Sequence, residues 1–312
     1  MRILIAVVVG FIALISCSEK SKLNELPLNL SAGKLYRFEQ FDSKFMSPRI
    51  VDIWVPNGYS SDIKYSVLYM HDGQMLFDST NTWNKSEWGV DETISQLIDQ
   101  KKIKPTIVVG IWHNSTTRHS DYFPRKPFDL LPQSTQDSLL KEAVRPNGTH
   151  IFNNGIQSDN YMRFIVEELK PFVDSNFSTN PSQQTTFIAG SSMGGLVSLY
   201  AICEYPEVFG AAACLSTHWT GIYKAENNPI PGVILDYLKS NAPNPHTHHL
   251  YFDYGTETLD ALYEPFQLRA DTIMLNKGYD LNSLKTLKFE GKDHSEQSWK
   301  ERLAIPFEFL LK

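Results

Sequence analysis

Apolar and polar positions along this chain form blocks that predict strands and helices in turn. Short apolar or β-branched runs, which are typical of buried strands, occur at 35–41, 50–55, 65–70, 106–112, 184–189, 211–215, 249–254 and 284–289. Helical spacing or helix-forming composition occurs at 89–101, from Asp159 onward, at 193–204, around Phe266 and from about Ser298. Strands that alternate with helices predict an α/β fold, with a mostly parallel central sheet and helices on both faces.

One long segment interrupts this alternation. Residues 113–158 are rich in Pro, Asn, Ser and Thr and show no clear period. We predict that this segment is a variable insertion above the carboxyl ends of the strands, within a single domain that spans 31–312.

The first residues lie outside that domain. Met1-Arg2 precede thirteen mostly apolar residues, Ile3 to Ile15, too few for a membrane helix of roughly 20, so 1–16 is predicted to be a secretory signal peptide. The run ends in Ser16-Cys17, which resembles the bacterial lipobox. That resemblance implies a lipid such as palmitate on Cys17, residues 17–30 as a tether, and export to the cell envelope, at the outer membrane or facing the periplasm. The alternative is an ordinary signal peptide cleaved near a cysteine.

Composition narrows the classes of partner. Of 312 residues, 42% are hydrophobic and 21% charged, enough apolar surface for a substantial core. The net charge of −6 argues against nucleic acid as a partner, because nucleic-acid binding needs a basic face. Cys203 and Cys214 fall in apolar segments, so buried free thiols are preferred to a disulfide.

The most informative chemical motif is Gly190-Ser191-Ser192-Met193-Gly194, which fits G-x-S-x-G. It follows a predicted strand and opens a predicted helix, the context in which this motif forms a sharp turn that exposes a nucleophilic serine in α/β-hydrolases. The flanking residues are small because backbones crowd such a turn. The motif therefore predicts Ser192 as a nucleophile.

A serine hydroxyl needs a base to take its proton. The base is usually a histidine, which follows the serine and the acid along an α/β-hydrolase chain. His294 lies in the polar loop 291–296 between a late strand and the last helix, so it is the predicted base. His246, His248 and His249 resemble a metal cluster, but no other spaced ligands accompany them. A solvated loop is preferred there, and no metal or other cofactor is expected.

The third triad member should follow the strand at 249–254. Asp260 and Glu257 are the candidates and Asp260 is preferred, whereas Asp253 lies within the strand and is assigned a structural role. The negative oxygen of a tetrahedral intermediate also needs backbone N–H donors. Met193 is predicted to supply one.

The turn 71–74 is predicted to supply a second backbone donor, from Gly73 or Gln74. His71 and Asp72 precede these two residues. They are assigned to ordering the turn rather than to chemistry.

With these motifs placed, the chain resembles the esterase D family of α/β-hydrolases, which includes enterochelin-esterase-like proteins and feruloyl and acetyl xylan esterases. The resemblance covers nearly the whole mature chain and rests on the segments at 68–78, 88–92, 164–169, 190–195, 205–210 and 293–296. It implies a carboxyl-ester hydrolase with Ser192 as nucleophile and His294 as base. Family members often carry the acid about three residues after the strand-end glycine, where this chain has Thr258. Counting back from the following helix gives Asp260.

The resemblance implies acylated carbohydrate or siderophore-type esters as substrates. Four aromatic residues could stack on sugar or aromatic rings, with core packing or a lid hinge as the alternative: Trp112, Tyr122, Phe123 and Trp219. Arg118, Arg125 and Lys126 are compatible with an anionic catecholate or with a solvated loop. Two other functions remain: an inactive surface-anchored binding lipoprotein, and acyl transfer to an acceptor other than water.

Overall fold

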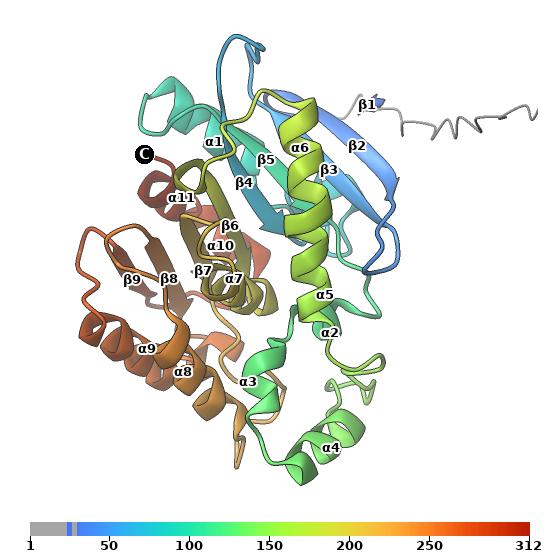
Figure 1. The fold of residues 1–312 in the computed structure, drawn as a ribbon, viewed down its shortest axis with the longest axis vertical. Helices are drawn as coiled ribbons and strands as arrows, with labels where there is room; N and C mark the ends of the chain where they lie inside the picture. The colour runs from blue at the N-terminus through green and yellow to red at the C-terminus, as the bar shows by residue number, and fades with distance from the viewer. Residues whose placement is uncertain (1–23, 27–29) are drawn as a thin grey trace, which may run out of the picture.

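The computed structural model describes residues 24–26 and 30–312, which form one nine-stranded sheet (Figure 1). The strand order is β1-β2-β3-β5-β4-β6-β7-β8-β9. The pairs from β5 to β9 are parallel, and β1, β2, β3 and β5 pair antiparallel at one edge. The strands are β1 (Asn24–Leu26), β2 (Lys34–Phe41), β3 (Arg49–Val55), β4 (Ser66–His71), β5 (Thr106–Ile111), β6 (Thr186–Ser191), β7 (Ala211–Leu215), β8 (His249–Gly255) and β9 (Leu284–Phe289).

Helices cover both faces of the sheet. They are α1 (Val90–Asp99), α2 (Arg118–Tyr122), α3 (Arg125–Asp129), α4 (Gln133–Glu142), α5 (Ser158–Arg163), α6 (Lys170–Asn176), α7 (Met193–Glu204), α8 (Ile230–Asn241), α9 (Glu264–Asn276), α10 (Glu296–Arg302) and α11 (Ala304–Leu310). A π-helical segment at Phe164–Leu169 joins α5 to α6, and together they form one long helix across the sheet (Figure 1).

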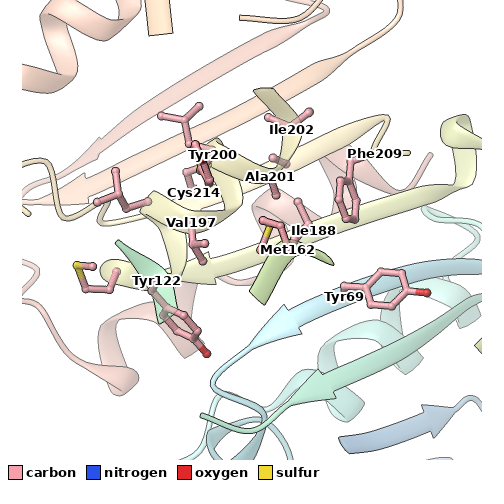
Figure 2. Close-up of a cluster of buried hydrophobic side chains, with 14 of the residues drawn as sticks. Tyr69, Tyr122, Met162, Ile188, Val197, Tyr200, Ala201, Ile202, Phe209 and Cys214 are labelled. Carbon is pink, nitrogen blue, oxygen red and sulfur yellow. The ribbon is translucent and has the colours of Figure 1, made fainter. Parts of the chain in front are cut away.

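Alternate residues of the central strands feed two apolar cores, because successive side chains of a strand point to opposite faces. In β4, Val67 and Tyr69 pack with residues of α5, α7 and α8. Leu68 and Met70 pack with residues of α1, α10 and α11 on the other face. Figure 2 shows part of the first core, where Val197 and Tyr200 of α7 lie with Ile188 of β6. These two cores fix the strand ends that carry the site.

The predicted fold class is confirmed, and the eight predicted strands are all present. The strand expected at 184–189 is Thr186–Ser191, since a 3-10 turn occupies Gln183–Thr185. The single helix expected from Ser298 was wrong. It is two helices that meet at Leu303, and Pro306, which lacks an N–H, lies in the first turn of the second, where a missing donor costs least. Helix α8 was not anticipated.

The insertion 113–158 contains α2, α3 and α4, three helices too short or too polar to show a period. Strand β1 lies within the segment expected to be a tether and pairs with β2. The predicted signal peptide, Cys17 and most of that tether lie outside the described residues. Within the described ranges, the structure contains no helix of the length and hydropathy that a membrane span requires. Cys203 and Cys214 are buried free thiols, as predicted.

Candidate active site

Ser192 occupies a strained turn between β6 and α7. Its backbone has φ 57° and ψ −121°, a conformation that non-glycine residues rarely adopt. A Cβ at Gly190 would come within 2.8 Å of the Gly194 backbone, so the crowding expected from the motif is present. The N–H of Ser192 donates to the Leu215 carbonyl at 2.9 Å. The strand, turn and helix therefore form the nucleophile elbow that the motif predicts.

His294 and Asp260 come together next to this turn. Nδ1 of His294 lies 2.5 Å from Oδ1 of Asp260. Oδ2 of Asp260 accepts hydrogen bonds from the Ser216 hydroxyl and from the Gly255 N–H, both at 2.6 Å. Burial acts to raise the pKa of the Asp260 carboxyl, but these hydrogen bonds outweigh burial and lower it, which keeps the carboxylate ionised. Glu257 is exposed to solvent, whereas Asp260 is buried and contacts His294, so Asp260 stays the predicted acid.

Ser192 and His294 line one cavity of about 560 Å³. Among the described residues no hydrogen bond joins the Ser192 hydroxyl directly to His294. The hydroxyl instead interacts with the Tyr263 phenol. Hydrogen bonds between catalytic groups are often long in the absence of substrate, so this arrangement is compatible with a serine–histidine pair.

The Tyr263 phenol has a second partner in His218. The Tyr263 oxygen lies 2.6 Å from Nδ1 of His218, and both side chains are buried. Burial lowers the pKa of His218 well below its usual value, so its imidazole is neutral. Nε2 of this ring has no hydrogen-bond partner. Sequence reasoning missed both residues, because nothing local marks a tyrosine that contacts Ser192 or a histidine that contacts that tyrosine.

Met193 is the first residue of α7, so its N–H is one of the donors that a helix leaves free at its N-terminus. This position suits the predicted oxyanion donor. Asp72 and Met75 line the Ser192 cavity, but Gly73 and Gln74 line a separate small recess beside Trp112. The second donor stays a prediction.

The loop after β4 is held by charged and aromatic partners. Arg118 donates two hydrogen bonds to Asp72, at 2.7 and 2.8 Å, and Nδ1 of His113 lies 2.7 Å from the same carboxylate. Burial acts to raise the pKa of Asp72, but Arg118 and His113 lower it far below its usual value. His71 pairs with the Tyr161 hydroxyl at 2.7 Å. These contacts agree with the loop-ordering role expected for His71 and Asp72.

Three of the four aromatic residues proposed for stacking on substrate are buried and not available for it. Tyr122, Phe123 and Trp219 are at most 1% exposed and pack in the core, so the alternative reading of these three was the correct one. Trp112 donates its indole N–H to Asp52 and lies against Arg37.

Sequence reasoning missed Trp83, whose side chain is 81% exposed and lines the Ser192 cavity. A tryptophan within the polar segment 78–87 was the available signal.

Of the three basic residues of the insertion that were compatible with an anionic substrate, only one lines the Ser192 cavity. Arg118 reaches the cavity, whereas Arg125 pairs with Asp129 and Lys126 with Glu204. Arg145, which sequence reasoning did not single out, lines the cavity and forms no ion pair within the described part of the chain.

The histidines at 246–249 do not form a metal site. His248 is buried, and its Nε2 lies 2.8 Å from the Gln183 side-chain nitrogen and 2.8 Å from the Pro206 carbonyl oxygen. In residues 24–26 and 30–312, no cluster of His, Cys, Asp and Glu side chains could hold a metal ion.

The mostly parallel sheet with helices on both faces defines an α/β-hydrolase fold, and the elbow that carries Ser192 is a feature of that class. The family model described as "Putative esterase" matches residues 43–305, so this chain belongs to that family and is a carboxylic ester hydrolase by class. The resemblance seen in the sequence is thereby confirmed.

Individual proteins with similarity to this chain include siderophore esterases. The ferri-bacillibactin esterase of Bacillus subtilis is 27% identical over 162 residues, which cover 50% of this chain and 49% of that protein. The siderophore enterobactin esterase of Emericella nidulans is 26% identical over 201 residues, covering 62% and 61%. The matched regions thus span about half to three fifths of these relatives.

A solved structure of a ferulic acid esterase is 16% identical, with a TM-score of 0.62 and coverage of 90% of this chain and 98% of that one. At this level of identity, the similarity establishes the fold.

Proposed function

We propose that this protein hydrolyses carboxylic esters with Ser192 as nucleophile, His294 as general base and Asp260 as the acid that orients the histidine. One observation carries the proposal: the 2.5 Å contact between His294 and Asp260 lies beside the elbow serine, and Ser192 and His294 open into the same cavity. Membership of the esterase family supports the reaction class.

The proposed reaction proceeds in two halves. His294 takes the Ser192 proton as Oγ attacks the ester carbonyl, and the carbonyl oxygen becomes negatively charged. In this proposal the N–H of Met193, the first residue of α7, stabilises that oxygen. When the tetrahedral intermediate collapses, the alcohol leaves with the proton from His294 and an acyl-enzyme remains. Water then attacks the acyl-enzyme with His294 as base, the carboxylic acid product is released, and Ser192 regains its proton.

The proposed substrates are acylated carbohydrate or siderophore-type esters that carry a ring. The cavity volume of about 560 Å³ lies within the range of small-molecule sites. The exposed Trp83 offers a flat surface to a sugar or aromatic ring, and the unpaired Arg145 favours a substrate with negative charge. The names of the siderophore and ferulic acid esterases above support this class.

Three experiments test the reaction. Ser192→Ala should lower turnover of p-nitrophenyl acetate by on the order of 10⁶-fold. Retained turnover would overturn the assignment of the nucleophile. A fluorophosphonate probe should label the wild-type protein at Ser192, and absence of labelling would indicate a binding protein that has lost the chemistry. Ester products formed with added sugar alcohols would indicate acyl transfer rather than hydrolysis.

A substrate panel tests the proposed class. It should contain acetylated xylan, a feruloylated sugar, a catecholate siderophore and p-nitrophenyl acetate. We expect at least one ring-bearing natural ester to exceed the aryl acetate in kcat/KM. If the simple ester is the best substrate, the proposed class is wrong.

We also propose that Cys17 carries a lipid that anchors the protein at the bacterial cell envelope. The support is the Leu14-Ile15-Ser16-Cys17 sequence after a short apolar run. Expression of the full chain in a bacterial host should give membrane-associated protein, whereas Cys17→Ser should release it. Wild-type protein found only in the soluble fraction would contradict the anchor.

A further inference from the structure

A buried polar network contacts the Asp260 oxygen that His294 does not use. Its members come from three elements, and each is at most 5% exposed: Asp253 in β8, Ser216 directly after β7, and Trp299 and Arg302 in α10. We call these residues the Ser216 network. Neither the motif pattern nor the proposed triad accounts for it.

The Ser216 hydroxyl is the centre of this network. It lies 2.9 Å from the Trp299 indole nitrogen, 2.9 Å from an Arg302 guanidinium nitrogen and 2.6 Å from Oδ2 of Asp260. An indole and a guanidinium can only donate hydrogen bonds, so they occupy the two acceptor positions of the hydroxyl. The single hydroxyl proton of Ser216 must therefore point to Asp260.

Arg302 is held in a position from which its guanidinium can donate to the Ser216 hydroxyl. Its guanidinium also donates to Asp253 at 2.9 and 3.1 Å, and the backbone N–H of Ser216 lies 3.1 Å from the same carboxylate. Removing both charges from water is costly, and a buried ion pair gives little net stability compared with apolar packing. The Arg302–Asp253 ion pair is therefore better explained by a contribution to the site than by a contribution to stability. Ser216 itself has φ 42°, an unfavourable conformation for a serine.

We propose that Ser216 is a positioning residue for ester hydrolysis. Arg302 and Trp299 fix and polarise its hydroxyl, and the hydroxyl holds the Asp260 carboxylate so that its other oxygen faces His294. Hydrogen bonds in such a chain strengthen one another in a buried setting. This inference rests on the proposed function, since it concerns how the acid is held.

The test is the pH profile of Ser216→Ala. Without the hydroxyl, Oδ2 of Asp260 loses one donor and its negative charge is less stabilised, so protonated His294 is favoured. We expect the acid limb of kcat/KM to move to higher pH and kcat to fall about tenfold, with KM little changed. The charged and titratable groups facing this pair remain in the variant: Arg302, Asp253, His218, Tyr263 and Asp293.

Two further variants keep the result interpretable. Ser216→Gly removes the same hydroxyl but suits the positive φ, so it should fold and show the same shift. Tyr279→Phe is the matched control, because its buried hydroxyl donates to the Pro243 carbonyl at 3.0 Å and reaches no member of the Ser216 network and not Asp260. It should keep the wild-type pH profile.

The outcomes separate this inference from the proposed function. Wild-type kcat and acid limb in folded Ser216→Gly would overturn the inference, and so would an equal shift in Tyr279→Phe. Failure of Ser192→Ala to abolish turnover would instead overturn the proposed function.

Discussion

His294 and Asp260 are 34 residues apart in sequence, yet Nδ1 of the histidine lies 2.5 Å from a carboxylate oxygen of the aspartate. The aspartate follows β8 and the histidine follows β9, two parallel neighbours whose carboxyl ends meet at one edge of the sheet. The register of these strands therefore aligns the proposed base with its acid. The remaining nitrogen of the imidazole is the one available to take a proton from Ser192.

Asp260→Asn should test this relationship directly. The amide cannot carry the negative charge that orients and stabilises protonated His294, so kcat should fall by about 10⁴-fold while the fold is retained. Steady-state kinetics with an aryl ester measures the loss. Glu257→Gln is the control, because Glu257 is exposed and should keep wild-type activity. The reverse pattern would mean that Glu257 is the acid.

Tyr263→Phe should reduce both stability and kcat. The phenol contacts Ser192 and lies 2.6 Å from Nδ1 of His218, so its loss leaves that buried nitrogen without a partner, at a cost of about 1–3 kcal/mol. We expect kcat to fall about tenfold, since Ser192 also loses its interaction with the phenol.

Tyr279→Phe is the matched control. It removes another buried hydroxyl, which donates to the Pro243 carbonyl at 3.0 Å outside the site. Denaturant unfolding and kinetics of both variants give the comparison. Equal kcat values in the two would show that Tyr263 has no part in turnover.

The ion pair between Asp72 and Arg118 should make stability depend on pH in a specific direction. The folded-state pKa of Asp72 lies far below its unfolded value of about 3.9, so its contribution is complete above that value and is lost as pH falls toward the folded pKa. Asp72→Asn should therefore be less stable than wild type by about 3 kcal/mol at neutral pH.

Unfolding at several pH values measures this difference. The gap between the two proteins should shrink below about pH 4. A gap that is constant down to pH 2 would show that the loss comes from packing rather than from charge.

The sequence predicted those candidate-site residues that a short motif or a neighbouring strand marks. Ser192 stands within a five-residue motif, and His294 and Asp260 occupy loops that follow recognisable strands. The Ser216 network could not be found in this way, because α10 approaches β7 and β8 only through tertiary packing. The prediction that Tyr122, Phe123 and Trp219 stack on substrate was wrong for the same reason, because tertiary packing buries them. An aromatic residue near an insertion has the same sequence signature whether it packs in the core, as Tyr122 does, or lies at the surface.

Trp83→Ala should therefore affect substrate choice and leave stability unchanged. The side chain is 81% exposed, so little apolar contact is lost on its removal, yet it lines the cavity that contains Ser192 and His294. A ring stacked on the indole contributes about 1 kcal/mol, which corresponds to a change of about fivefold in KM. We expect KM for a feruloylated sugar to rise by that factor and KM for p-nitrophenyl acetate to rise less. Leu281→Ala, which truncates a 93% exposed side chain outside this cavity, is the control for loss of a surface hydrophobe. If Trp83→Ala changes both substrates equally, the indole shapes the cavity without contacting the ring.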